Sequence, residues 1–230
     1  MEAHEAPHQY QPINSSEDIR VLRLEPGAFA EPLIGSLVVR KIGDDGYKEH
    51  LPAYDCVSYC WGPQEHFSSL DSDGRALRIT VAVDEMLRYL RDPKEPRCLW
   101  IDAICINQAD NQEKSQQVRI MDRIYASAQE VRIWLGPATD AEIDAAFPSF
   151  SPKNTDFRTA FVILEERFQE YPVGGQTPFS PLTDDFFCRY WFTRRWVLQE
   201  VILARVAIVH CGHYQAPWKR FSDGASAIRS

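Results

Sequence analysis

The sequence lacks the features that would place the protein in a membrane, in the secretory pathway or on nucleic acid. No run approaches the roughly 20 apolar residues that a bilayer-spanning helix needs, and the polar start MEAHEAPHQYQPINSSED contains no signal-peptide core. Positive charge is in deficit, since the formal net charge is −8, and this argues against electrostatic capture of nucleic acid. We therefore expect a cytoplasmic protein with no membrane span and no nucleic-acid partner.

Cysteine pairs of the kind that hold zinc are also lacking. The six cysteines form no CxxC pair, and the stretch HCGH at His210–His213 has no second ligand pair at zinc spacing. In a reducing compartment, free thiols are favoured over three disulfides. We expect no metal and no resident cofactor.

The chain does have enough apolar sequence for a compact domain, because 44% of its 230 residues are hydrophobic. Residues 1–17 are typical of a flexible leader, and 18–230 of a single domain. The chain stops within WKRFSDGASAIRS, which resembles a helix cut short, so we expect a piece of a longer protein. IRVLRL and SLVVRKI alternate apolar and polar residues, which predicts half-exposed strands of an N-terminal antiparallel ribbon.

The middle of the chain alternates between strands and helices. YDCVSYCWG, CLWID and EVRIWLGP predict three buried strands, RVAIVHC predicts a fourth, and RALRIT predicts an edge strand. Helices are predicted between the first three, so the connections are right-handed crossovers. The sequence predicts an α/β fold with a mostly parallel sheet flanked by helices.

The two predicted helices have apolar faces at helical spacing. The first is VAVDEMLRYLRDP, whose predicted buried face contains Val83, Met86, Leu87 and Leu90. Asp110 and Glu113 stand at capping-box spacing before the second. Its predicted face contains Val118, Met121, Tyr125 and Ala128. Residues 138–192 predict an insertion on the sheet, with an amphipathic helix of its own.

Three separated blocks resemble a known family. They are YDCVSYCWG, LWIDAICINQADNQEKSQQVRIMDRIYASAQEVRIWLG and RRWVLQEVILA, and together they resemble the fungal heterokaryon incompatibility (HET) domain over roughly Ile19 to Phe221. The resemblance implies a cytoplasmic module of filamentous fungi that triggers cell death when genetically different hyphae fuse. It also implies a separate recognition domain or partner protein.

A more distant resemblance concerns mechanism. HET domains are similar to TIR domains, in which a strand of the form YDVFLSYRG, an acidic-ended second strand and a third hydrophobic strand precede a helix with the motif WxxxE. Here Asp102 ends the second predicted strand, and Trp196 and Glu200 fit WxxxE. The resemblance implies a TIR-like (flavodoxin-like) sheet. It also implies an NAD glycohydrolase, with NAD as substrate and Glu200 as the catalytic residue.

The chemistry fits a single carboxylate. When nicotinamide leaves NAD as a neutral base, positive charge develops on the ribose, and a carboxylate beneath that centre stabilises it. Burial of Glu200 among apolar neighbours would raise its pKa unless Arg194, Arg195 or a ribose hydroxyl compensates. The alternative for Glu200 is a structural ion pair with a nearby arginine.

The binding crevice is expected where ligands bind in open α/β sheets, at the carboxyl ends of the strands. Ser58, Tyr59, Trp61 and Gly62 follow the first strand and Asp102 ends the second. Gly62 would let backbone approach a phosphate.

Arginine and tryptophan side chains could supply further contacts with the ligand. Arg195 could pair with a phosphate bidentately. Trp61 and Trp196 could stack on a ring, although core packing explains both tryptophans as well. Asp102 could instead be a helix or loop cap.

Two further functions remain open. The domain could be a scaffold that signals by self-association without turnover, and assembly into a homo-oligomer could also complete an enzymatic site. A metal-dependent nucleotide-processing site using Asp102 and Glu200 has no ligand pattern in its favour, so we rank it last.

Overall fold

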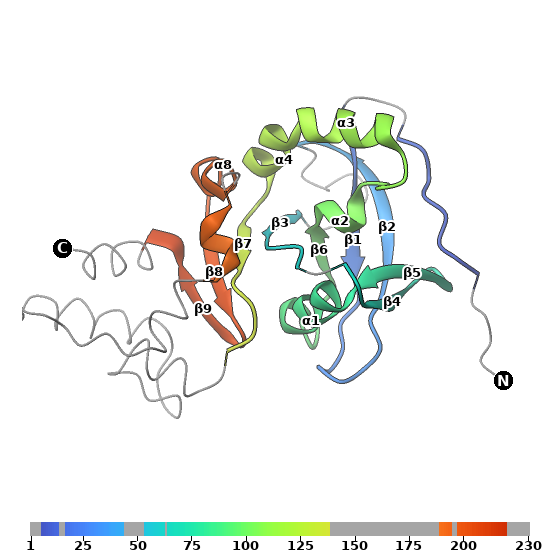
Figure 1. The fold of residues 1–230 in the computed structure, drawn as a ribbon, viewed down its shortest axis with the longest axis horizontal. Coiled ribbons are helices and arrows are strands. Elements are labelled where there is room, and N and C mark those ends of the chain that lie inside the picture. Colours follow the sequence, from blue (N-terminus) through green and yellow to red (C-terminus); the bar gives the residue numbers. More distant parts are fainter. Residues whose placement is uncertain are drawn as a thin grey trace, which may run out of the picture.

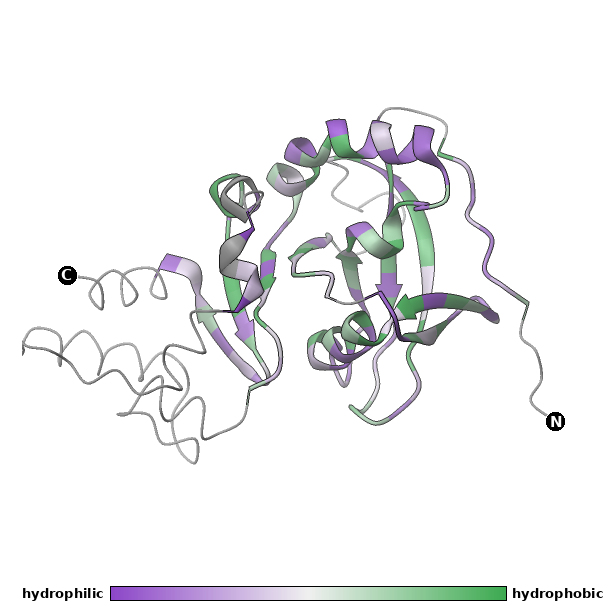
Figure 2. Cartoon of the chain, in the orientation of Figure 1, coloured by the Kyte–Doolittle hydropathy of each residue, from purple (hydrophilic) through white to green (hydrophobic). Residues whose placement is uncertain are grey.

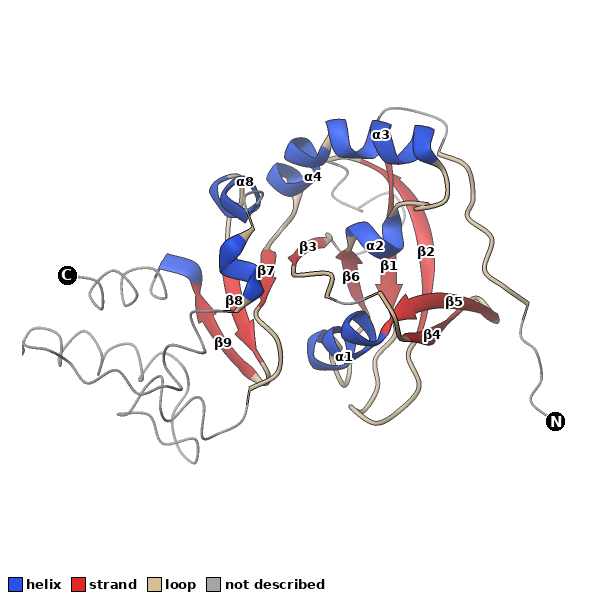
Figure 3. Cartoon of the chain, viewed as in Figure 1, coloured by secondary structure: helices blue, strands red, loops and turns tan. Residues whose placement is uncertain are grey.

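A computed structural model of the chain describes residues 6–13, 17–43, 53–62, 64–138, 189–194 and 197–219. Its strands are β1 (Asp18–Leu24), β2 (Ile34–Lys41), β3 (Asp55–Ser58), β4 (Phe67–Ser72), β5 (Arg75–Thr80), β6 (Arg97–Trp100), β7 (Val131–Trp134), β8 (Ala207–Cys211) and β9 (Tyr214–Pro217). Its helices are α1 (Val81–Leu90), α2 (Asp102–Cys105), α3 (Asn111–Arg119), α4 (Met121–Ser127), the 3-10 turn η1 (Tyr190–Thr193) and α8 (Val197–Ile202). These strands form one mixed sheet in the order β5-β4-β2-β1-β6-β3-β7-β8-β9 (Figures 1 and 3).

The middle of the sheet is parallel. β3 pairs with β6 on one side and β7 on the other, and β8 continues in parallel beyond β7. In chain order these four strands therefore lie as second, first, third and fourth across the sheet. All four residues of β3 are buried, because strands of a parallel sheet are covered on both faces. In the view of Figure 1, α1 lies below these strands and α4 and α8 lie above them.

The predicted N-terminal antiparallel ribbon is confirmed, but its first strand is buried and not half-exposed as predicted. β1 and β2 pair antiparallel from Asp18 with Lys41 to Leu24 with Gly35. β1 was expected to be half-exposed, yet Arg20 is 1% exposed and its apolar neighbours are buried. The reason is that β1 also pairs with β6, so it is an interior strand of the sheet.

The far edge of the sheet is a hairpin that the sequence predicted only in part. RALRIT is the edge strand β5, as expected, and β4 pairs antiparallel with it. β4 was not predicted. The Asp73–Gly74 turn joins the two strands with positive φ angles of 54° and 74°. Two central residues with positive φ fit the tight hairpin turn that an Asp-Gly pair favours.

The apolar face predicted for the first helix is buried, but the face predicted for the second is buried only in part. The predicted face of α1 is buried in full, and Thr80 caps the helix by accepting the N–H of Val83. The single helix predicted after Asp110 is two helices, α3 and α4, because Ile120 leaves helical geometry with φ −111° and ψ 9°. Val118, predicted to be buried, is 47% exposed. Figure 2 shows α3 as largely hydrophilic.

Residues 6–13, part of the expected leader, contact the sheet. Pro7 pairs with Ala76 of β5, and the hydroxyl of Tyr10 donates to the carbonyl of Ile104 at 3.0 Å. The carbonyl of Gln11 accepts the Nε–H of Arg20 at 2.9 Å. This segment therefore packs on the edge strand and on the core. Most of the predicted insertion at 138–192 lies outside the described residues.

Candidate functional site

An open cleft lies at the carboxyl ends of β3 and β6. Its volume is about 690 Å³, and it is lined by Cys60, Trp61, Gly62, Asp102, Tyr190 and Arg194. Small-molecule sites commonly measure about 300–1,000 Å³. Three of the expected binding residues therefore line one cleft of suitable size. They are Trp61, Gly62 and Asp102.

Trp61, which follows β3, and Asp102, which follows β6, are joined by hydrogen bonds. The indole Nε1–H of Trp61 donates to both carboxylate oxygens of Asp102, at 3.0 and 2.9 Å. Gly62 follows with a φ of 65°, a conformation that favours glycine. The half-buried Trp61 ring packs against the core and is held at the cleft by a partner for its indole N–H, as is usual for buried tryptophan.

Asp102 is the first residue of α2 as well as a lining residue of the cleft. Its carboxylate accepts the backbone N–H of Ala103 at 2.7 Å, and its carbonyl accepts Nε2–H of Gln108 at 2.8 Å. Burial raises the pKa of Asp102, while the bonds from Trp61 and Ala103 counter part of the rise. The carboxylate is therefore fixed in place and faces the cleft.

Glu200 is buried in α8 and is held by β3. The hydroxyl of Ser58, the last residue of β3, donates to Glu200 Oε2. The same hydroxyl oxygen accepts the indole Nε1–H of Trp191 at 2.9 Å. A serine has one hydroxyl proton, so accepting from Trp191 leaves that proton for Glu200. Burial raises the pKa of Glu200, although the Ser58 bond and the charge of Arg194 oppose the rise.

Arg194 stands between Glu200 and the cleft. Its Nη1 donates to the carbonyl of Tyr59, and its Nη2 lies 3.6 Å from Glu200 Oε1. Glu200 is not among the residues that line the cleft. The arginine contact expected as the alternative for Glu200 is therefore present, and Glu200 does not open onto the cleft beside Trp61 and Asp102.

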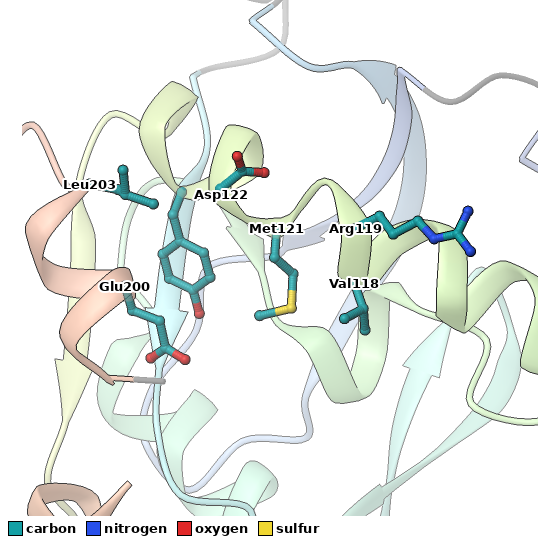
Figure 4. Close-up of a pocket in the computed structure, with 7 residues that line it drawn as sticks. Val118, Arg119, Met121, Asp122, Glu200 and Leu203 are labelled. Atoms are coloured by element: carbon teal, nitrogen blue, oxygen red, sulfur yellow. The ribbon is translucent and has the colours of Figure 1, made fainter. Parts of the chain in front are cut away.

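Glu200 instead lines a separate, smaller pocket of about 280 Å³. Figure 4 shows Glu200 and Leu203 on the α8 side, with Val118, Met121 and Asp122 opposite on α3 and α4. The reason is that α8 packs against α4, and Glu200 lies on the side of α8 that faces this pocket.

The remaining expected residues divide into two groups. Ser58 and Tyr59 are buried and do not line the cleft. The Tyr59 hydroxyl is buried beside the carboxylate of Asp102. Burial raises its pKa, and the nearby Asp102 charge adds to that rise. Arg195 and Trp196 lie outside the described residues, so their predicted roles stay predictions.

The sequence analysis missed Cys60 and Tyr190 as lining residues, and it gave Arg194 no place in the cleft. Arg189 brings η1 to this position, because its Nη1 donates to the carbonyls of Leu135 and Pro137 at 2.8 and 2.9 Å. Those carbonyls follow β7. The only sequence signal was the position of Arg194, six residues before Glu200 in RRWVLQE.

Comparison with known proteins places the site within a described family. The model of the family "Heterokaryon incompatibility protein (HET)" matches residues 54–200, a range that begins before β3 and ends at Glu200. No solved structure matches the chain. Within the described residues, every helix is too short or too polar to cross a bilayer.

Two fungal relatives match parts of their own length. "Heterokaryon incompatibility protein 6, OR allele" of Neurospora crassa is 32% identical over 238 residues, which cover 86% of this chain and 34% of the relative. "Vegetative incompatibility protein HET-E-1" of Podospora anserina is 26% identical over 160 residues, which cover 66% of this chain and 9% of the relative. The chain thus spans about a third of the first relative and about a tenth of the second.

Proposed function

Because the chain belongs to the heterokaryon incompatibility (HET) family, we propose that it is a cytoplasmic cell-death effector domain of fungal incompatibility. In this proposal it hydrolyses NAD to nicotinamide and ADP-ribose in a TIR-like way. Glu200 is the catalytic residue, and the cleft beside it receives the nucleotide.

The order of the parallel strands supports a TIR-like site. Second, first, third and fourth is the order in which a flavodoxin-like sheet begins, and such sheets bind ligands outside the carboxyl ends of their strands. The cleft lies at the carboxyl ends of β3 and β6. This placement agrees with a nucleotide site, although four strands in this order also occur in proteins of many other functions.

The observation that carries the proposal is the fixed, buried carboxylate of Glu200. Ser58 donates to it and is oriented in turn by Trp191. A carboxylate held in a water-poor place stabilises developing positive charge without having to reorganise. Its position directly behind the end of β3 suits a charge that develops in the adjoining cleft.

The reaction is balanced without a further reactant. The bond between the ribose C1′ and the nicotinamide nitrogen breaks, and its electron pair neutralises the pyridinium. Water then bonds to C1′ and releases a proton to solvent. Glu200 stabilises the cationic sugar between these two events, which requires the carboxylate to be ionised.

Nicotinamide release from NAD tests the proposal. Wild type is compared with Glu200→Gln, which keeps the shape and the bond from Ser58, and with Glu17→Gln as a control at an exposed glutamate. Assembly is followed by light scattering in the same samples, because a site shared between chains is silent in a monomer. We expect release by wild type and by the control only. Equal release by Glu200→Gln, or no release by assembled wild type, contradicts the proposal.

A second candidate function is signalling by self-association without turnover. It is favoured by exposed apolar side chains, two of which, Val118 and Leu203, line the pocket of Figure 4. Ile202 is 76%, Val118 47%, Val206 46% and Leu203 36% exposed, and such clusters commonly mark contact surfaces. If Glu200→Gln still kills fungal cells as wild type does, the scaffold function is favoured over the enzyme.

A further inference from the structure

Arg194 connects the two sides of the site. It lines the cleft, it donates to the Tyr59 carbonyl, and it lies near Glu200. The side chain of Arg194 is 26% exposed, whereas that of Glu200 is 4% exposed. A ligand in the cleft therefore meets the arginine before it meets the glutamate.

The contact between Arg194 and Glu200 is loose. Its 3.6 Å separation exceeds the roughly 2.7–2.9 Å that is typical of a charged hydrogen bond. A guanidinium has five N–H donors and no acceptor. Bonding to Tyr59 and a long contact to Glu200 leave donors for an incoming ligand.

The charges in the cleft match a ligand that is itself dipolar. Asp102 supplies a carboxylate and Arg194 supplies a guanidinium, and both line the same cavity. Arginine binds phosphate oxygens through its planar fork better than it binds most other groups. A carboxylate suits a pyridinium or a cationic sugar. One half of a dinucleotide, with a pyridinium at one end and a pyrophosphate at the other, has this arrangement of charge.

We infer that Arg194 is the pyrophosphate-binding residue of the cleft, and that a bound pyrophosphate draws it away from Glu200. The identity of the ligand as a dinucleotide rests on the proposed function. In the structure Arg194 is the counter-charge of Glu200 and lies on its cleft side. When the ligand binds, the pyrophosphate takes the guanidinium, and the positive charge of the nicotinamide riboside half replaces it beside Glu200.

This exchange explains how a glutamate outside the cleft can act on a substrate within it. No helix has to move, because only the arginine side chain changes partner. The exchange also discriminates between substrates, since a nucleoside that lacks pyrophosphate has nothing with which to displace Arg194. Arg194 is thus a positioning residue for Glu200 as well as a binding residue for the ligand.

Calorimetric binding to two ligands tests the inference without any turnover. The probes are ADP-ribose, which has the pyrophosphate but no nicotinamide, and nicotinamide riboside, which has the cation but no phosphate. The variants are Arg194→Gln, Arg194→Lys and the control Arg205→Gln. Arg205 is exposed and precedes β8, so it lies at the amino ends of the parallel strands, away from the cleft.

We expect ADP-ribose to bind about 10- to 100-fold more weakly to Arg194→Gln, as for loss of a charged hydrogen-bonding group worth about 1.5–3 kcal/mol. Arg194→Lys should recover part of the affinity and Arg205→Gln should match wild type. Binding of nicotinamide riboside should not weaken in Arg194→Gln. A purely structural arginine would weaken both ligands together, and thermal melting shows whether each variant is folded.

The inference is overturned if ADP-ribose binds folded Arg194→Gln as it binds wild type, or if wild type does not bind ADP-ribose. Failure of the proposed function is a different result. If wild type binds ADP-ribose through Arg194 but releases no nicotinamide from NAD, the enzyme proposal fails and the pyrophosphate site remains. If NAD is cleaved equally by Arg194→Gln and wild type, the inference fails and the enzyme remains.

Discussion

The pair formed by Arg20 and Glu113 differs from the pair formed by Arg194 and Glu200 in distance, in the burial of the arginine and in the direction of the pKa shift of the glutamate. Arg20 binds Glu113 through two nitrogens at 2.5 and 2.9 Å, whereas the Arg194 contact is 3.6 Å long. Burial alone would raise the pKa of Glu113, but bonds from Arg20 and Asn107 hold it below its ordinary value. For Glu200, burial prevails and the pKa is raised.

Under the proposed function, the comparison separates a structural ion pair from one whose charge is used. At Glu113 each carboxylate oxygen has a close charged partner, and Arg20 also donates to the carbonyls of Gln11 and Cys105. That pair ties strand, leader segment and helix together. At Glu200 the neutralisation is incomplete and the arginine faces an open cleft. Incomplete pairing beside a cavity is the pattern expected of a group whose charge is used.

The largest effect is expected from breaking the structural pair. Arg20→Leu leaves Glu113 buried without its partner, and such losses destabilise proteins by about 3–5 kcal/mol. Urea unfolding measures the change. The double variant Arg20→Leu with Glu113→Leu should recover most of this loss, though not all, because the carbonyls of Gln11 and Cys105 also lose a donor. A double variant no more stable than the single one would contradict this account.

The sequence predicted this half of the molecule well in outline and poorly in detail. The β1–β2 ribbon follows from local alternation, but the burial of Arg20 depends on Glu113, 93 residues away. β4 escaped prediction because FSSLDS has only Phe67 and Leu70 as large apolar residues. Its signal was the Asp-Gly pair that follows it, which demands a tight turn.

The site shows the same limit. The loop residues Trp61, Gly62 and Asp102 were predicted to meet because the carboxyl ends of neighbouring parallel strands lie together. The direction in which Glu200 points was not predictable, since it depends on how α8 packs against α4. The place of Arg194 depends on η1, which is held by contacts of Arg189 with carbonyls 54 and 52 residues away in sequence, and no local pattern shows such contacts.

The second largest effect is expected at the other pair, and on activity. Glu200→Gln removes the charge that stabilises the cationic sugar, so nicotinamide release should fall about 100- to 1,000-fold, the range for loss of one transition-state contact. Steady-state release at saturating NAD measures it. Arg20→Leu, assayed below its melting temperature, should retain activity, because Arg20 does not line the cleft. Equal losses in the two variants would abolish the distinction between the pairs.

A smaller effect is expected on the pH dependence of stability. Because the folded-state pKa of Glu200 is raised above 4.5, folded wild type holds a proton that the unfolded chain has lost, and stability falls as pH rises through the raised value. Glu200→Gln lacks this ionisation, so its stability relative to wild type should increase from pH 4 upward. Unfolding midpoints at a series of pH values measure the difference.

Activity should change in the opposite direction over the same pH range. Ionised Glu200 is the active form, so nicotinamide release by wild type should rise with pH where its stability falls. Glu113 is the internal contrast. Its lowered pKa contributes stability that is present above the ordinary value of about 4.5 and is lost only as pH falls through the lowered value. A wild-type activity that is constant through the window where stability changes would contradict the role given to Glu200.

The smallest effect is expected at a third arginine–glutamate pair, which is exposed and serves as the reference for the other two. Arg123 and Glu17 lie 3.3 Å apart, but their side chains are 49% and 55% exposed. Water screens such pairs, and they contribute about 0–1 kcal/mol. Arg123→Gln should therefore change the free energy of unfolding by less than about 1 kcal/mol and leave nicotinamide release unchanged. A loss as large as that of Arg20→Leu would mean that distance, rather than burial, decides what these pairs contribute.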